Sequence, residues 1–178
     1  MLGYSFSVPS QLTSELDLSA VNIARGFAMD APLKAKSGHQ GTAMALAPLA
    51  HVLYSRVMKH DPTDALWPDR DRFVLSAGHA SILQYSMLFL QGYGLELSDI
   101  QNFRQWDSAT PGHPERGHTA GIEVTTGPLG QGFAHAVGLA LAERHLRARF
   151  GSELTNHHTY VIAGDGCLME GVSHEAAS

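Results

Sequence analysis

The sequence predicts one α/β domain in which helices flank a parallel sheet. Two short runs rich in β-branched and aromatic residues, 72–76 and 159–163, alternate with longer stretches of helical periodicity. Each run leads directly into a glycine turn, as a strand does when it ends at a ligand-binding loop. Ligands of open α/β sheets bind beyond the carboxyl ends of the strands, so we expect the site at the turns that contain Gly78 and Gly164.

The first part of the chain is predicted to be helical. Apolar residues recur at helical spacing over residues 14–31, and Pro32, which lacks a backbone donor, is expected to end or kink that helix. A second helix is predicted to begin at Pro48, an acceptable first-turn residue, and to reach the turn at residues 61–62. A glycine-rich loop over residues 37–42 would then join the two helices.

Two more helices and a long loop are predicted after the first strand. A helical pattern over residues 82–90 ends at Gly92, and Ser98 is expected to cap a shorter helix that extends to Trp106. Residues 107–126 contain several prolines and glycines and show no sustained period. They predict a long functional loop, which is either ordered or flexible.

The remaining elements are a long helix and a strand. Residues 129–150 are predicted to form a helix that ends before Gly151. The run at residues 159–163 predicts a central, fully buried strand of the parallel sheet. Four apolar residues of the long helix are expected to face the core: Phe133, Val137, Ala140 and Leu141.

The composition is that of a folding, globular chain. Its 178 residues include 44% hydrophobic and 16% charged residues with a formal charge of −5, which predicts one domain. Charges of both signs are interspersed, so nucleic-acid and anionic-membrane binding are not expected. No stretch approaches the roughly 18 apolar residues of a membrane span, and residues 1–10 lack the features of a signal peptide. The single cysteine, Cys167, excludes an internal disulfide, and a cytoplasmic location is expected.

Histidine has an unusual placement in this sequence. Four of the 11 histidines directly follow a glycine, where random placement with 18 glycines would give about one such pair. Glycine lets the backbone approach a ligand, and imidazole donates or accepts a proton near neutral pH. Each pair alone is equally well an exposed histidine after a turn, but together they predict a histidine-rich polar pocket: His39, His79, His113 and His118. Five others are expected at the solvent-exposed surface: His51, His60, His145, His157 and His158.

Two glycine-bounded turns could face a ligand. Gly164, Asp165 and Gly166 follow the second strand and place a carboxylate on a tight turn whose amides can face phosphate oxygens. This hard oxygen ligand suits Mg²⁺ or Ca²⁺, although the tripeptide is also an ordinary turn. The glycine-rich segment 127–132 exposes main-chain groups at a helix start, where it either binds a planar heterocycle or only connects two elements.

Six segments of the chain resemble successive transketolase motifs in that family's order and spacing. They are Ser-Gly-His at 37–39, Leu-Ser-Ala-Gly-His-Ala-Ser at 75–81, Phe-Arg-Gln at 103–105, Thr-Pro-Gly-His-Pro-Glu at 110–115, Thr-Thr-Gly-Pro-Leu-Gly-Gln-Gly at 125–132 and Gly-Asp-Gly-Cys-Leu-Met-Glu-Gly at 164–171. Thiamine enzymes share Gly-Asp-Gly widely, whereas the Thr-Pro-Gly-His-Pro-Glu segment is particular to transketolases and dihydroxyacetone synthases. The resemblance runs from about Asn22 to the end of the chain.

The resemblance implies a thiamine diphosphate-binding fold that is incomplete. Residues 1–178 would be the N-terminal part of the diphosphate-binding domain, with the remaining domains absent. The family transfers a two-carbon ketol unit from a ketose phosphate to an aldose phosphate, in the pentose phosphate pathway or carbon fixation. Implied partners are sugar phosphates and a second subunit of a homodimer, or complementing transketolase domains. The isolated chain is expected to be inactive.

The resemblance also implies roles for particular residues. Asp165 would ligate the Mg²⁺ (or Ca²⁺) that anchors thiamine diphosphate, while His39 and His113 would face the donor sugar's hydroxyls and assist proton transfer. Glu170 would lie near the subunit interface. Five residues would meet the cofactor: His79, Gly127, Leu129, Gly166 and Glu170.

The chain also departs from the family pattern. Gln40 stands where proline is usual, Ala77 where asparagine is common, and Pro32 interrupts a helix that is normally continuous. The asparagine that serves as the metal's second side-chain ligand would lie beyond Ser178, as would the glutamate that activates the aminopyrimidine. A truncated or split transketolase is therefore expected.

Two other functions stay open at this stage. One is a fragment of dihydroxyacetone synthase or deoxyxylulose phosphate synthase, which are enzymes of related chemistry. The other is a module without catalytic activity that pairs with other transketolase chains.

Overall fold

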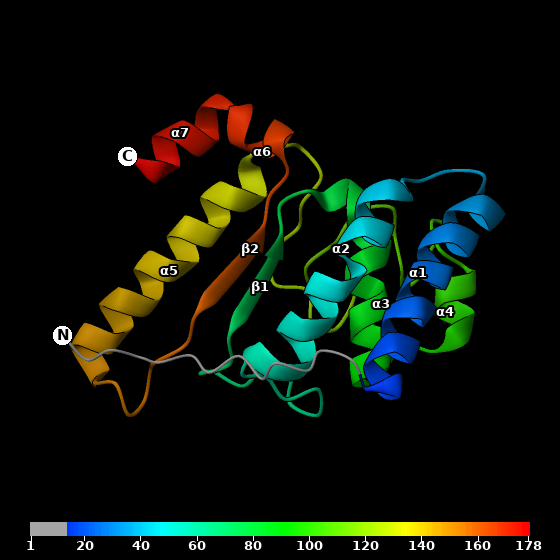
Figure 1. Ribbon diagram of the computed structural model, residues 1–178. Coiled ribbons are helices and arrows are strands. Elements are labelled where there is room, and N and C mark those ends of the chain that lie inside the picture. Colours follow the sequence, from blue (N-terminus) through cyan, green and yellow to red (C-terminus); the bar gives the residue numbers. More distant parts are fainter. Residues whose placement is uncertain (1–13) are drawn as a thin grey trace.

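The computed structural model describes residues 14–178 and contains a parallel pair of strands between helices (Figure 1). Strand β1 (Arg72–Leu75) pairs with β2 (Thr159–Ile162), and Leu75 lies opposite Ile162. Helix α5 (Gln131–Phe150) packs against both strands from one side. The predicted α/β class with a parallel sheet is confirmed.

Two sequence expectations concern membranes and export. The expectation that residues 1–10 are not a signal peptide falls outside the described part of the chain. Among residues 14–178, no helix combines the length and the apolar character that crossing a membrane needs.

Helix α1 (Glu15–Ala35) begins with a reciprocal cap. The Ser14 hydroxyl accepts the backbone N–H of Asp17 at 3.1 Å, and the Asp17 carboxylate accepts the backbone N–H of Ser14 at 3.3 Å. The helix continues past Pro32, so the expectation that it ends there is wrong. Pro32 is buried in the last turn, where the missing donor costs only one intrahelical bond.

Helix α2 (Gly41–Val52) begins at Gly41 rather than at Pro48 as predicted, and Pro48 lies inside it. A proline there leaves the Met44 carbonyl without its normal intrahelical donor. Arg25 of α1 donates its Nε–H to that carbonyl at 3.3 Å and so offsets part of the loss. The chain then forms a short π-helical turn, η1 (Leu53–Val57).

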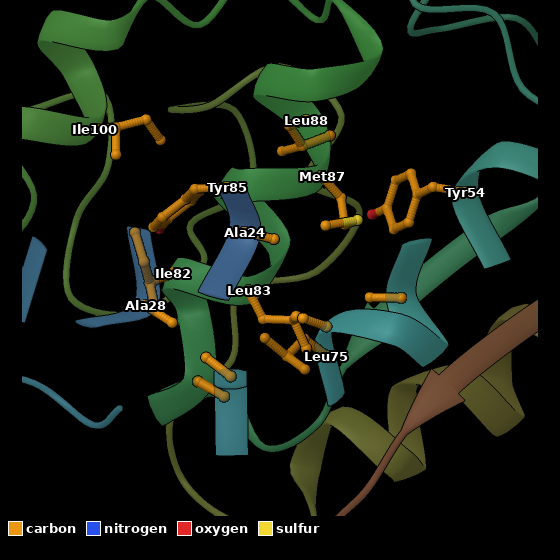
Figure 2. Close-up of a cluster of buried hydrophobic side chains, with 14 of the residues drawn as sticks. Ala24, Ala28, Tyr54, Leu75, Ile82, Leu83, Tyr85, Met87, Leu88 and Ile100 are labelled. Carbon is orange, nitrogen blue, oxygen red and sulfur yellow. The ribbon is translucent and has the colours of Figure 1, made fainter. Parts of the chain in front are cut away.

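Helix α3 (Ser81–Gln91) forms the centre of the helical core (Figure 2). It follows a 3-10 turn, η2 (Gly78–Ala80), and ends at Gly92 in the left-handed conformation, as predicted. All residues from Ser81 to Leu88 are buried. They pack with apolar and aromatic side chains of the neighbouring elements, among them Ala24, Ala28, Tyr54 and Leu75. The turn at Gly78 is therefore attached directly to a helix that is buried in the core.

Helix α4 (Leu97–Gln101) is shorter than predicted, and its first turn is capped differently. The backbone N–H of Glu96 donates to the Asp99 carboxylate at 2.7 Å, so Ser98 is not the cap. Trp106, expected on this helix, is 99% exposed and lies outside it.

The long loop after α4 is held by side-chain hydrogen bonds. The Thr110 hydroxyl donates to the Asp99 carbonyl at 2.6 Å, and the Thr119 hydroxyl donates to the Ala109 carbonyl at 2.7 Å. The loop is therefore ordered, which is one of the two alternatives that the sequence left open.

The burial predicted for α5 and β2 is partly wrong. The buried positions of α5 are Gly132, Ala136 and Glu143, whereas Leu141 is 66% exposed. In β2 only Ile162 is fully buried. An unbroken apolar run is typical of a strand with neighbours on both sides, but within residues 14–178 this strand pairs with β1 alone. Two short helices, α6 (Asp165–Met169) and α7 (Gly171–Ala177), follow β2.

Three of the five histidines expected at the surface are at least half-buried. His51 is buried and donates a hydrogen bond from Nε2 to the Asp17 carboxylate at 2.8 Å. His60 bonds to the Tyr54 carbonyl at 2.7 Å through one ring nitrogen, and to the Tyr93 hydroxyl through the other. His157 is 8% exposed. His145 and His158 are exposed, as predicted.

Asp17 joins the start of α1 to the end of α2, and we expect Asp17→Asn to lower stability in a pH-dependent way. Hydrogen bonds from His51 and Ser14 hold the pKa of the Asp17 carboxyl well below its ordinary value. A lowered folded-state pKa stabilises the fold above the unfolded-state pKa of about 4, and that stabilisation is lost as the pH falls below it. Urea unfolding at pH 7 and at a series of values down to pH 3 measures this.

The matched control is Asp30→Asn, an exposed carboxylate on the same helix. It should leave the free energy of unfolding nearly unchanged at every pH. A deficit of Asp17→Asn that stays constant from pH 7 to pH 3 would contradict this role of the carboxylate.

Candidate active site

The two turns predicted to carry the site lie side by side at the carboxyl edge of the sheet, at the top of Figure 1. The backbone N–H groups of Ser76 and Ala77 both donate to the Ile162 carbonyl, at 2.9 and 3.3 Å. His79 follows the first turn and Asp165 the second. Because the strands are parallel and in register, both side chains belong to the same edge.

The structure brings together three histidines that are far apart in the sequence. The rings of His39 and His79 meet edge to face, with their centroids 5.0 Å apart. Burial lowers the pKa of His79, and the neighbouring His39 lowers it further. Burial also lowers the pKa of His113, followed by the charges of Arg104, His79 and His39. His79 and His113 are therefore neutral near pH 7, as a group that accepts a proton must be.

The fourth histidine after a glycine is used differently. His118 is exposed, and its Nε2 bonds to the Ser108 carbonyl at 2.7 Å. This bond stabilises the long loop. His118 is thus an exposed histidine after a glycine turn, the alternative to a place in the predicted pocket.

The segment after the long loop contacts the histidine cluster. A Cβ placed on Gly127 would lie 3.4 Å from the His113 ring, and one placed on Gly78 would lie only 2.8 Å from the Gly127 nitrogen. Glycine is therefore required at position 78 for this close approach. The Thr126 hydroxyl is buried beside Gly127 and has no hydrogen-bond partner among residues 14–178.

The same segment continues to the turn after β2. A Cβ on Gly166 would lie 3.1 Å from Leu129 Cδ1, and one on Gly130 would lie 2.7 Å from the Cβ of Glu170. Pro128, Leu129 and Glu170 line a groove of about 530 Å³ between α5 and α7. Segment 127–130 thus lies between the turn that contains Gly78 and the short helices that follow β2.

The residues present fit part of a magnesium diphosphate site. Asp165 is exposed at the start of α6, where the preceding Gly164 has no side chain to cap the first N–H groups. Within residues 14–178, no three His, Cys, Asp or Glu side chains are grouped so that they could hold a metal ion by themselves. A single carboxylate suits Mg²⁺ when ligand oxygens and water complete the shell.

Sequence reasoning missed the residues that hold His113 in place. Ser81 and Tyr85 lie one turn apart on α3, and their hydroxyls donate to the carbonyls of Gly112 and His113 at 2.9 and 3.1 Å. Burial raises the pKa of Tyr85, so its phenol stays protonated and donates. The spacing of these two hydroxyl-bearing residues by four positions, one helical turn, is the signal that could have identified them.

Comparison with known proteins shows what the chain is similar to. Residues 16–178 match the family model of the transketolase thiamine diphosphate binding domain. Transketolase 2 of Escherichia coli is 59% identical over 160 residues, which are 88% of this chain and 24% of that protein. The structure of transketolase from Leishmania mexicana has a TM-score of 0.86 and 55% identity, and the match covers 89% of this chain and 24% of that one.

A second solved structure is a Pichia stipitis transketolase mutant in complex with fructose 6-phosphate. Its TM-score is 0.89 at 50% identity, with 92% of this chain and 25% of that chain covered. The chain thus spans about a quarter of the length of the transketolases it matches. A family model that covers all but the first residues, together with this fold, shows that the chain belongs to the transketolase family and has that family's thiamine diphosphate-binding fold.

Proposed function

We propose that this chain supplies part of the active site of a transketolase, which transfers a two-carbon ketol unit from a ketose phosphate to an aldose phosphate. One observation carries the proposal. His39, His79 and His113 converge with Gly127 at the same sheet edge as Asp165. Proton-transfer groups and a hard metal ligand at one edge suit a reaction on a hydroxylated, phosphorylated substrate. The sugar phosphate in the Pichia stipitis complex supports this substrate class.

The proposed roles follow the chemistry of each group. Asp165 holds Mg²⁺ (or Ca²⁺), while Gly127, Leu129 and Gly166 present the main chain to the cofactor. Thiamine diphosphate, when bound, supplies the carbanion that serves as nucleophile and electron sink.

The histidines and Glu170 complete this assignment. His79 faces the cofactor from the turn after β1. His39 and His113 accept and return protons at the sugar hydroxyls, because an imidazole is both a proton acceptor and, once protonated, a proton donor. Glu170 lies at the edge that we assign to contact with a second subunit.

We further propose that the site is completed by other transketolase domains, in a homodimer, and that the reaction belongs to the pentose phosphate pathway. Large apolar side chains are exposed along α5 and on the short helices after β2. Exposed apolar side chains in this number are typical of surface that other domains cover. They are Leu141, Phe150, Leu168, Met169 and Val172.

A chimera tests the proposed function. Residues 16–178 replace the matching quarter of E. coli transketolase 2, and ketol transfer from fructose 6-phosphate to an aldose phosphate is measured with and without thiamine diphosphate and Mg²⁺. We expect cofactor-dependent turnover by the chimera and none by the 178-residue chain, which should bind thiamine diphosphate weakly because it offers one carboxylate.

The wild-type E. coli enzyme and a chimera with His113→Asn are the controls. A folded chimera that binds thiamine diphosphate but does not turn over would favour the module without catalytic activity. Robust turnover by the 178-residue chain alone would refute the view that other domains complete the site.

A further inference from the structure

Arg104 has a backbone conformation that few residues other than glycine adopt. Its φ is 61°, in the left-handed region. Its N–H donates to the Thr110 carbonyl at 3.0 Å, which closes the loop that leads to His113. Backbone strain of this kind persists where the surroundings hold it and often occurs at functional sites.

The Arg104 guanidinium lies across Gly112. A Cβ placed on Gly112 would lie 3.0 Å from Nε and 3.1 Å from both Cζ and Nη2, so the flat face of the group covers the glycine. Any side chain at position 112 would displace it. Ser81 and Tyr85 hold the Gly112 and His113 carbonyls through hydrogen bonds. The backbone of His113 is therefore fixed by α3 and by Arg104 together.

The charge of Arg104 is not neutralised by the described part of the chain. None of the ion pairs within residues 14–178 includes it, and its Nη1 is buried without a hydrogen-bond partner. Its contact with an aromatic ring, 5.9 Å from Cζ to the centroid of Phe103, leaves the positive charge in place. An arginine stays protonated at any pH that proteins tolerate, so the charge is permanent.

We propose that Arg104 is a positioning residue that keeps His113 uncharged, so that this imidazole acts as a proton acceptor. The fixed guanidinium on Gly112 opposes a second positive charge on the adjacent residue. The catalytic meaning rests on the proposed function, whereas the effect on the ionisation of His113 does not.

The groups that face His113 allow this effect to be separated from others. After burial, Arg104 is the strongest of the influences that lower the pKa of His113; His79 and His39 lower it further, and Glu115 raises it. The pKa of His79 is lowered by burial and by His39, without a contribution from Arg104. His79 is therefore an internal control in the same cluster.

An NMR titration of the histidine ring resonances of the 178-residue chain tests the proposal. The variants are Arg104→Met, which keeps the length without the charge, and Arg104→Lys, which keeps the charge, with His113→Asn to assign the signal. We expect Arg104→Met to raise the pKa of His113 by about half a unit to one unit, and Arg104→Lys to leave it low. The pKa of His79 should change much less in both.

An unchanged pKa of His113 in a folded Arg104→Met variant would overturn the proposal, and so would an equal rise in Arg104→Lys. If Arg104→Met does not fold, the wild-type chain is titrated at low and high salt. Salt should raise the pKa of His113 more than that of His79, and no difference between them would count against Arg104.

The chimera gives a kinetic readout of the same effect. On the acidic side of its pH profile, kcat/KM should begin to fall at a higher pH in the Arg104→Met variant, and should not do so in the Arg104→Lys variant. A chimera without turnover would contradict the proposed function and leave the NMR result to decide this inference.

Discussion

Gly132→Ala will destabilise the fold by roughly 1–3 kcal/mol, because the added methyl group has no room. A Cβ on Gly132 would lie 2.6 Å from Ser76 Cα, which is backbone and cannot rotate away. The N–H of Phe133 donates to the Ser76 hydroxyl at 3.0 Å, so the start of α5 is also tied to this point. Moving the helix away would break that bond and expose the end of β1.

Gly138→Ala is the matched control in the same helix. Nothing lies within 4 Å of a Cβ at that position, which is exposed. Alanine is the better helix former, so this variant should be stabilised by about 0.5–1 kcal/mol. Urea unfolding followed by far-UV circular dichroism measures both. If both variants change stability by the same amount and sign, the close approach of α5 to Ser76 is wrong.

Asp165→Ala will reduce ketol transfer by the chimera about 100-fold or more, and thiamine diphosphate will bind more weakly. Asp165 is the side chain at the carboxyl end of β2 that suits a hard cation. No group of three potential ligands exists among residues 14–178 that could hold the ion instead. The measurement is kcat/KM as a function of Mg²⁺ concentration, together with a calorimetric titration of the cofactor.

Glu175→Gln is the control for this experiment. Glu175 is an exposed carboxylate on α7, and its loss changes the charge of the same region by the same amount. Its activity should stay within about twofold of the parent, since an exposed charge is screened by water and salt. Activity of Asp165→Ala equal to that of Glu175→Gln would mean that the metal has other ligands.

The elements that the sequence predicted well are those set by local pattern. Both strands and the stop at Gly92 follow from runs and turns that a few residues define. The start of α2 does not, because Pro48 is tolerated through a bond from Arg25 on another helix. A rule about proline in helices cannot anticipate a donor supplied by tertiary structure.

The candidate site shows the same division. The Gly-His pairs pointed to His39, His79 and His113, which lie together in the structure because glycine turns present side chains from loops. It could not separate His118, whose ring bonds to a carbonyl within its own loop. Arg104 lies within one of the motifs, but its contact with Gly112 depends on a left-handed backbone that the sequence does not reveal.

The carbonyl of Ile162 accepts hydrogen bonds from both Ser76 and Ala77, and this has a mechanical consequence. The turn that carries His79 and the turn that carries Asp165 cannot slide past one another without breaking both bonds. A displacement of β2 along its axis therefore carries the imidazole and the carboxylate together. The spacing between the two turns is therefore fixed by the sheet itself, so this part of the candidate site moves as one unit.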